Sequence, residues 1–469
     1  MTTAPQSLAS VGGPSIVWFR QDLRLSDQAA FAAAAAEGAV IAVYVRDEKA
    51  AGPWAMGAAQ RWWLHHSLKA LGAALAAKGV PLVLRRGDAA AEVARLAAET
   101  KAVRVHALHH DEPWEQAAEA ALGGVVDLEL HEGARLIPPE RLRTGAGGRF
   151  RMFTPYWKAL LREMPPPLPV RTPEEVMGFA GEIASDALAD WGLLPSAPDW
   201  AGGFHVWTPG EAGARAALTD FLPEIAAYDE ARNLPSIAGT SRLSPHLHFG
   251  EISPATVWHH AAKVAKAVAE PFLRQLAWRD FGANVIDILP DYGRENGRAA
   301  FDALPWRTGA EADRDFRAWT RGRTGYPIVD AGMRELWATG WMHNRVRMIA
   351  ASFLIKHLLI DWRCGERWFW ETLVDADYGS NAVNWQWVAG TGIDANMFGR
   401  IMAPLVQSQK FDAADYIRTW VPELKDLGDA AIHDPEEAGL LRPQGYPDKI
   451  VGHREGRERA LAAGRHARG

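Results

Sequence analysis

The sequence predicts two domains, an α/β domain on a doubly wound parallel sheet followed by an all-α domain. Up to about residue 137, short continuous apolar runs alternate with helical stretches, as in a parallel sheet covered on both faces. Farther along, this pattern gives way to segments with 3.6-residue periodicity. A proline-rich stretch lies between the two patterns. We therefore expect an α/β domain at 14–137, a long linker at 138–205, a helical domain at 206–427 and a tail at 428–469.

The first domain has five candidate strands, each a short run rich in Val, Ile, Leu or aromatic residues. An open sheet of this kind binds ligands at the carboxyl ends of its strands. The first strand leads into WFRQDLRLSD and not into a glycine-rich dinucleotide fingerprint, so a standard NAD site is not expected. The expected strands are 15–19, 39–45, 80–86, 103–108 and 125–130, with helices at 57–78, 88–100 and 113–122.

The linker contains several prolines and the glycine-rich TGAGG at 144–148, which predicts short, broken regular structure. The stretch YGSNAVNWQW after Asp377 is expected to be a loop, and the tail to hold one short helix and a frayed basic end. In the second domain, helices are expected at 211–226, 254–268, 271–288, 330–339, 341–360 and 366–374.

Composition excludes several protein classes. Hydrophobic residues make up 48% and charged residues 23%, and no apolar run approaches the roughly 20 residues of a membrane span, so we expect a cytoplasmic globular protein. The single cysteine, Cys364, excludes an intramolecular disulfide, a cysteine-rich zinc site and a four-cysteine iron–sulfur cluster. The histidine pairs lack ligand spacing with acidic partners, so no metal site is expected. A net charge of −6 argues against a general coating of nucleic acid but permits a local basic pocket.

Tryptophan is unusually frequent, because 11 of the 21 tryptophans fall between Trp278 and Trp420. Each indole N–H needs a partner when it is buried. A tryptophan-rich helical core is the simpler interpretation, and a stacking or electron-handling site is the alternative.

Two segments would place aromatic and polar groups together on one helical face. Trp341, Asn344, Arg345 and Met348 share a face by helical spacing, as do Gln275, Trp278 and Arg279. Such faces make poor cores and good walls for a planar polar ligand, unless the arginines simply extend to solvent.

Two further stretches are consistent with a polar ligand site. Asp375 and Asp377 could cap a helix, bind a cation or pair with arginines such as Arg279 and Arg347. TSRLSP at 240–245 could hold phosphates, although a helix cap is its commoner meaning.

These elements, in this order, resemble the DNA photolyase and cryptochrome family from about residue 14 to 463. The most specific stretch is TGYPIVDAGMR at 324–334, continuing through TGWMHNRVRMIAASFLIKHLLIDW to Trp362. WFRQDLRLSD at 18–27, TSRLSP and NWQW at 384–387 add to it. The chain looks most like the class I cyclobutane pyrimidine dimer photolyases. The resemblance implies an antenna-binding α/β domain and a helical domain that holds a folded, U-shaped FAD.

The resemblance also implies residue roles around FAD. Asn381 would face flavin N5, and Arg347 would pair with Asp375. The phosphates and ribose would be held by Tyr228, Thr240, Ser241, Arg242, Leu243 and Ser244. The polar edges of the cofactor would be lined by Arg279, Asn344, Arg347, Asp375 and Asp377.

Several of the clustered residues would then act in electron transfer or in binding the lesion. Trp385, Trp362 and Trp306 match the family's three-tryptophan chain from the flavin to the surface. The walls that receive the damaged bases would be Gln275, Trp278, Asn344, Arg345, Met348 and Trp387.

The implied activity is that of a deoxyribodipyrimidine photolyase, a carbon–carbon lyase. Excited reduced FAD would give an electron to a flipped-out cyclobutane dimer, which splits and returns the electron. The expected partner is UV-damaged DNA, and we expect a monomer without a membrane segment or metal cluster. The antenna remains open between methenyltetrahydrofolate, a deazaflavin, a second flavin and none. A cryptochrome-type photoreceptor is the main alternative, but its marker, a long C-terminal extension, would have to fit into 42 residues after Leu427.

One position departs from the dimer-repairing pattern. Gln275 stands where those relatives carry a Glu that hydrogen-bonds the lesion, so we predict slower or less efficient repair. A Gln there also occurs in (6-4) photolyases and animal-type cryptochromes. However, (6-4) enzymes place a second histidine where Asn344 follows His343, and their bacterial iron–sulfur relatives need four cysteines. Both observations argue against (6-4) repair.

Overall fold

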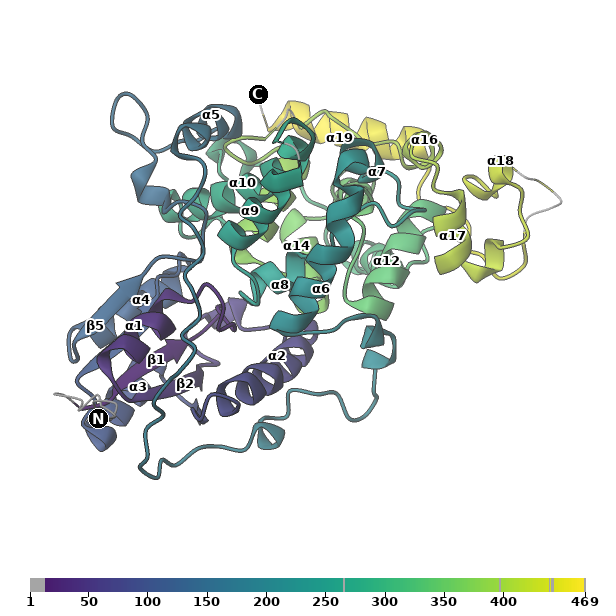
Figure 1. The fold of residues 1–469 in the computed structure, drawn as a ribbon. Helices are drawn as coiled ribbons and strands as arrows, with labels where there is room; N and C mark the ends of the chain where they lie inside the picture. The colour runs from purple at the N-terminus through teal and green to yellow at the C-terminus, as the bar shows by residue number, and fades with distance from the viewer. Residues whose placement is uncertain (1–12, 265, 396–397, 438, 440–442, 468–469) are drawn as a thin grey trace, which may run out of the picture.

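The computed structural model describes residues 13–264, 266–395, 398–437, 439 and 443–467. An α/β domain and a larger helical domain pack against each other, and a long connection runs between them over the surface (Figure 1). Within the described part of the chain, no helix combines the length and the apolar character that a bilayer span requires.

The first domain is built on five parallel strands in the order β3-β2-β1-β4-β5. The order reverses at β1, where Ser15 pairs with Val40 of β2 on one side and with Arg104 of β4 on the other. The predicted doubly wound sheet is therefore confirmed. The strands are β1 Ser15–Phe19, β2 Val40–Arg46, β3 Leu82–Arg86, β4 Arg104–Leu108 and β5 Leu128–His131.

Helices cover both faces of the sheet because its central strands are apolar on both sides. Val17 and Phe19 face α1 (Ala29–Glu37) and α2 (Ala58–Ala76). The opposite face, with Ile16 and Trp18, meets α3 (Ala89–Thr100) and α4 (Pro113–Gly123). The three predicted helices agree with α2, α3 and α4, whereas α1 is an alanine-rich helix that the sequence had not singled out.

The linker contains a longer helix than the sequence predicted. Helix α5 (Phe153–Glu163) lies between its proline-rich parts and buries Phe153, Tyr156 and Trp157 against the helical domain. The Asp394 carboxylate accepts the first free amide, that of Phe153, at 3.0 Å. Packing of this apolar face outweighs the flanking breakers, so the expectation of only short, broken structure was wrong here.

The helical domain encloses the largest core cluster. Its helices are α6 Glu211–Phe221, α7 Tyr228–Ala231, α8 Ser244–His248, α9 Pro254–Val264, α10 Lys266–Ile288, α11 Ala310–Thr320, α12 Pro327–Thr339, α13 Asn344–Ser352, α14 Trp362–Thr372, α15 Tyr378–Ala389, α16 Pro404–Lys410, α17 Ala414–Trp420, α18 Asp429–Ile432 and α19 His453–His466. Along the whole chain, short 3₁₀ helices are η1 Gly52–Trp54, η2 Pro139–Arg141, η3 Leu188–Trp191, η4 Ala201–Val206, η5 Leu222–Ala227, η6 Ala299–Phe301 and η8 Pro422–Leu424, and η7 Phe353–His357 is a π-helical turn.

The stretch expected to be a loop after Asp377 is helix α15. The Asp377 carboxylate accepts the Ser380 amide at 2.7 Å, which caps the helix, and Gly390 ends it with φ of 82°. The glycine, serine and asparagines that resembled loop formers lie in a helix whose inner face is buried. Cap and packing together outweigh their weak helix propensity.

The helix expected at 341–360 is shorter than predicted, because α13 covers only Asn344–Ser352. It begins at Asn344, because the His343 ring accepts the Arg345 amide at 3.2 Å, and it passes into the π-turn η7. Trp341 therefore precedes the helix and does not share a face with Asn344. The tail also differs from expectation, since α19 is a docked helix of 14 residues whose Ala460 and Ala463 are buried.

A glycine sets the approach of the two domains. The Leu23 amide bonds to the Phe249 carbonyl at 3.0 Å, and the Arg24 guanidinium bonds to the Gly250 carbonyl at 3.0 Å. Gly250 has φ of 62°, and a Cβ there would lie 2.1 Å from the Gln21 carbonyl oxygen. Only glycine lets the end of α8 come this close to the segment that follows β1.

Candidate functional site

A cavity opens in the helical domain, and eight of the 20 sequence-predicted site residues line it. One face of α13 forms one wall, with side chains three and four residues apart. Helix α15, the segment before it and the end of α14 form the other wall. The sequence-predicted residues in the lining are Asn344, Arg347, Met348, Asp375, Asp377, Asn381, Trp385 and Trp387.

An ion pair closes one side of this cavity. The Arg347 guanidinium lies 2.9 Å from Asp375 Oδ2, so the expected pairing is present. Ser244 Oγ donates to the same oxygen at 2.6 Å, and Arg347 Nε donates to the Met342 carbonyl at 2.7 Å. Asp375 is thus held from both the 240–244 segment and α13. Its second oxygen, Oδ1, is buried without a partner in the described part of the chain.

The second acidic group, Asp377, stays ionised despite its burial. Burial alone would raise its pKa, but the Arg135 and Arg279 guanidiniums attract the carboxylate and lower the pKa of Asp377 to about 2. Arg279 donates to the Ala134 carbonyl at 2.8 Å and the Leu247 carbonyl at 3.1 Å. Burial lowers the pKa of Arg279 to about 10, so it remains charged at neutral pH.

Asn381 is oriented from behind by a carboxyl group on α14. Its Nδ2 donates to Glu366 Oε1 at 2.8 Å and to the Glu366 carbonyl at 3.2 Å. Both bonds use the amide nitrogen, which leaves Oδ1 of this cavity-lining side chain as an acceptor. Burial raises the pKa of Glu366 to about 8, so this carboxyl is mainly protonated at neutral pH.

Of the three tryptophans of the expected electron path, Trp362 lies on α14 and Trp385 on α15, whereas Trp306 lies before α11. Trp385 meets Phe369 edge-on, with ring centroids 4.9 Å apart. A Cβ at position 365 would lie 2.2 Å from the Trp385 ring, so Gly365 makes room for it. Trp362 is fully buried and donates to Asn296 Oδ1 at 3.0 Å. Trp306 is half-buried and packs against the outside of the same core.

Two further tryptophans line a hollow beside the cavity. Trp278 and Trp387 both contribute to it, and Trp387 belongs to the cavity as well. Trp278 stacks on Phe153 of α5, with centroids 3.5 Å apart and planes 6° apart. Arg400 lies over the Trp387 ring at 5.5 Å. The linker helix therefore fixes the orientation of one aromatic wall.

Other predicted residues lie away from the cavity lining. The Arg345 guanidinium turns to Asn233 and lies 4.4 Å from the centroid of the Phe411 ring. Gln275 is half-buried on α10, and its amide nitrogen donates to the Pro271 carbonyl at 3.0 Å. Tyr228 is buried against Phe221 and Phe272.

The 240–244 segment reaches the cavity mainly through Ser244. Thr240 and Ser241 are half-buried, and Ser241 Oγ accepts the Leu243 amide at 3.4 Å. Arg242 stacks on Trp341, with its guanidinium 4.7 Å from the ring centroid. The Leu243 side chain is in the core, so it can meet a ligand only through its backbone.

The lining fits a flavin. A flavin ring system is flat and carries both hydrogen-bond donors and acceptors at its edge. The unpartnered Asp375 Oδ1 is an acceptor for a ring N–H, and the Asn381 amide oxygen is a second acceptor. Asn344, Arg347, Asp375, Asp377 and Asn381 would hold the polar edges of the ring.

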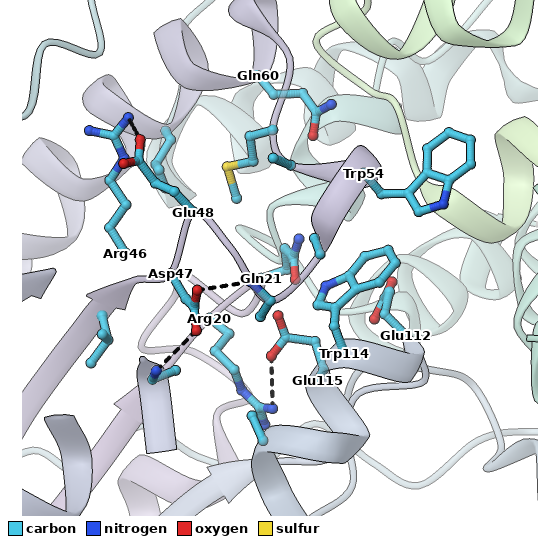
Figure 2. A pocket seen from close by; sticks show the side chains of 18 of the residues that line it. Arg20, Gln21, Arg46, Asp47, Glu48, Trp54, Gln60, Glu112, Trp114 and Glu115 are labelled. Atoms are coloured by element: carbon cyan, nitrogen blue, oxygen red, sulfur yellow. Dashed lines mark hydrogen bonds and ion pairs between the residues drawn. The ribbon is translucent and has the colours of Figure 1, made fainter. Parts of the chain in front are cut away.

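A second pocket lies at the carboxyl ends of β1 and β2, where the strand order reverses. This is the position at which open α/β sheets bind ligands. In the close-up of Figure 2, Trp54, Trp114 and Glu115 surround the pocket, and Arg20 bonds to Glu115. Tyr378 at the start of α15 also lines it, so it adjoins the element that carries Asp377.

Sequence reasoning missed Glu366 and Phe153. Glu366 lies on the face of α14 that carries Trp362 and Phe369, four residues after the first and three before the second. A carboxyl group on an otherwise aromatic helical face was the sequence signal that could have identified it. Phe153 lies in the linker, more than 120 residues from the tryptophan on which it stacks, and no local pattern connects them.

Comparison with known proteins agrees with this geometry. Residues 15–174 match the family model of DNA photolyase, and residues 272–466 match that of the FAD binding domain of DNA photolyase. The chain is 48% identical to the deoxyribodipyrimidine photo-lyase of Agrobacterium fabrum (strain C58 / ATCC 33970), over 96% of this chain and 97% of that protein.

Two solved structures share the fold. A bacterial class III photolyase from Agrobacterium tumefaciens superposes with a TM-score of 0.92 and 46% identity, over 98% of this chain and 99% of that one. An archaeal photolyase from Sulfolobus tokodaii, described with two FAD molecules, gives a TM-score of 0.80 and 30% identity, over 96% of this chain and 99% of that one. The class I assignment expected from the sequence gains no support from these structures.

The buried carboxyl of Glu366 predicts a pH dependence of stability. Its pKa is raised on folding, so its contribution is complete below the ordinary pKa of 4.5 and is lost as pH rises to about 8. At about 1.4 kcal/mol per pKa unit, the upper bound of this loss is about 5 kcal/mol. We expect the wild type to lose unfolding free energy relative to Glu366→Gln between pH 5 and 8, measured by denaturant unfolding. Parallel pH profiles of the two proteins would contradict this assignment.

Proposed function

Because the chain belongs to the DNA photolyase and cryptochrome family, as a flavoprotein enzyme of light-dependent DNA repair, we propose that its substrate is the cyclobutane pyrimidine dimer. The observation that carries this proposal is a single cavity. The expected flavin contacts Arg347, Asp375 and Asn381 share it with Trp387, an expected wall of the lesion site. An electron donor and a flipped-out lesion would meet there.

The cavity residues prepare this reaction by position and charge. Bound reduced FAD, when excited by light, supplies the electron. The Arg347 and Asp375 ion pair holds the ring edge in one orientation. Asn381 presents its amide oxygen at the proposed N5 position, because Glu366 occupies the amide nitrogen. Asn381 can therefore accept an N–H at that position without a charged group beside the ring.

The tryptophans beside the cavity suit two adjacent pyrimidines of one strand that have left the duplex. Trp278 and Trp387 offer flat apolar faces on which unstacked pyrimidines can lie. A cyclobutane dimer is already poorly stacked, so its extrusion costs less than that of undamaged bases. Phe153 keeps Trp278 in place, which reduces the side-chain freedom lost on binding.

Positive charge beside the cavity fits the DNA backbone, since Arg345 contacts Met348 and Arg400 lies over Trp387. Burial lowers the pKa of Arg345, and the nearby guanidiniums of Arg232 and Arg400 lower it further. Arg345 Nε is buried without a hydrogen-bond partner in the described part of the chain. Phosphate groups would relieve this repulsion, and binding should weaken with salt through counterion release. Because the chain as a whole has a net charge of −6, attraction to DNA requires a local cluster of positive charge of this kind.

The three tryptophans provide a route for reducing the cofactor. Trp385 borders the cavity, Trp362 is buried behind it, and Trp306 reaches the surface. We assign them to electron supply in that order. A monomer and a cytoplasmic location stay predictions from the sequence.

We also place this chain with the class III enzymes, since it is 46% identical to the class III structure with a TM-score of 0.92. The pocket at the sheet is proposed to hold an antenna chromophore. Its aromatic and charged lining fits a planar ligand, and its contact with α15 brings that ligand toward the flavin. The absorption spectrum of the purified protein identifies the chromophore among a folate, a deazaflavin and a second flavin.

Repair of defined oligonucleotides tests the proposed substrate. We expect the reduced protein, under near-ultraviolet or blue light, to restore thymines in an oligonucleotide that carries one cyclobutane dimer. It should leave a matched (6-4) oligonucleotide unchanged, and neither should react in the dark. Repair of the (6-4) lesion alone would contradict the substrate assignment. Repair of neither lesion would favour the photoreceptor alternative.

Replacing Gln275 tests the departure from the dimer-repairing pattern. A carboxyl group at this position could supply a stronger, charge-assisted or proton-donating contact to the lesion. We expect Gln275→Glu to raise the number of dimers repaired per absorbed photon, with flavin content unchanged. Gln275→Ala provides the control without a polar group and should lower the yield. An unchanged yield in Gln275→Glu would show that the amide does not limit repair.

A further inference from the structure

Two histidines and a glutamate meet at the edge of the sheet. None of the three lines either of the two pockets described above. In the register of β4 with β5, His106 pairs with Glu129, and Leu108 pairs with His131. Side chains alternate along a strand, so His106, Glu129 and His131 fall on one face. Helix α1 packs against this part of the sheet and ends at Glu37 beside His106 (Figure 1).

The nitrogen and oxygen atoms of this cluster have the spacing of metal ligands. His106 Nδ1 lies 3.0 Å from His131 Nε2 and 3.9 Å from Glu129 Oε2, and His131 Nε2 lies 3.7 Å from Glu129 Oε1. Ligands about 2.0–2.1 Å from a tetrahedral zinc ion stand about 3.3 Å apart. These separations, which involve both oxygens of Glu129, bracket that value. Small side-chain rotations would therefore place the two imidazole nitrogens and one Glu129 oxygen on one ion.

The outer nitrogen of His106 already has the partner that metal-binding histidines use. His106 Nε2 lies 3.0 Å from Glu37 Oε2, which also accepts the Ser15 hydroxyl at 2.8 Å. An Nε2–H donated to this carboxylate leaves Nδ1 as the free lone pair, aimed at His131 and Glu129. His106 is fully buried, so this orientation is held by packing as well as by hydrogen bonds.

The local charge balance also favours a cation. Arg104 is the one cation that pairs with this group in the described part of the chain. It lies 2.7 Å from Glu37, 2.9 Å from Asp127 and 3.1 Å from Glu129. Three carboxylates around one guanidinium leave an excess of two negative charges among these side chains.

We propose that His106, Glu129 and His131 bind one divalent transition-metal ion of the zinc type, with water in the fourth position. Two imidazoles and one carboxylate are ligands suited to zinc and its neighbours and poorly suited to calcium or magnesium. The ion would tie the edge strand β5 to β4 and, through Glu37, to α1. This site departs from the sequence expectation of no metal, and it does not depend on the proposed repair function.

Zinc binding by the full-length flavoprotein tests the proposal. After treatment with a chelator, the protein is titrated with ZnCl₂ and dialysed, and bound zinc is measured by elemental analysis. We expect one zinc per chain and, with CoCl₂ as the probe, the ligand-field bands of a tetrahedral site. His131→Ala should weaken zinc binding at least 100-fold, because it removes a ligand. Glu129→Gln should weaken it by about 10-fold or more, and both variants should retain flavin and repair activity.

Matched variants separate this site from adventitious binding. Asp127→Asn removes a carboxylate that pairs with Arg104 but is no ligand, and His205→Ala removes an exposed histidine elsewhere. Both should bind zinc like the wild type, as should a His65→Ala/His66→Ala double variant. Absence of a retained zinc in the wild type would overturn the proposal. Equal zinc content in the wild type and in His131→Ala would also overturn it. If His131→Ala fails to fold, the same comparison is made between the wild type and Glu129→Gln.

Discussion

Compensation of buried carboxylates is the constraint on which the site depends. Asp375 and Asp377 lie on the short segment before α15, and each would be costly to bury without a cation. Arg347 of α13 pairs with Asp375, while Arg135 and Arg279 hold Asp377 ionised. These arginines come from a helix of the second domain, from the chain that leaves the α/β domain, and from α10. Removing one partner of such a buried pair typically costs about 3–5 kcal/mol, so the requirement for charge balance draws three distant segments around one cavity.

The contact between α14 and α15 orients residues that we propose for cofactor binding and for electron transfer. Helix α14 presents Trp362, Gly365, Glu366 and Phe369 on one face toward α15, at the spacing of adjacent helical turns. One helix contact therefore orients Asn381 through Glu366, makes room for Trp385 and buries the middle tryptophan of the path. The clustered tryptophans, for which an ordinary core was the simpler interpretation, can therefore be assigned separate proposed roles. Trp362 and Trp385, which we propose for the electron path, are also buried members of the core.

The sequence predicted the layers of the fold well because their signals are local. Apolar strands and amphipathic helices are patterns of a few residues, and the sheet agrees with the expected strands within about three residues at each end. The prediction of a loop at α15 was wrong because a single capping carboxylate and burial outweigh helix propensity. The contacts of Glu366, the stacking of Phe153 and the pairing of His106 with His131 depend on tertiary packing or strand register. No sequence window contains both partners of these last two contacts.

The central claim is that the cavity between α13 and α15 holds FAD through the carboxylate of Asp375. Equilibrium FAD affinity of Asp375→Asn tests it most directly, with Asp199→Asn, on the exposed part of the linker, as the control. A charged hydrogen bond contributes about 1.5–3 kcal/mol. We therefore expect FAD affinity to be at least tenfold weaker in Asp375→Asn and unchanged in the control. Circular dichroism should show both variants folded. Wild-type FAD affinity in a folded Asp375→Asn would contradict the account.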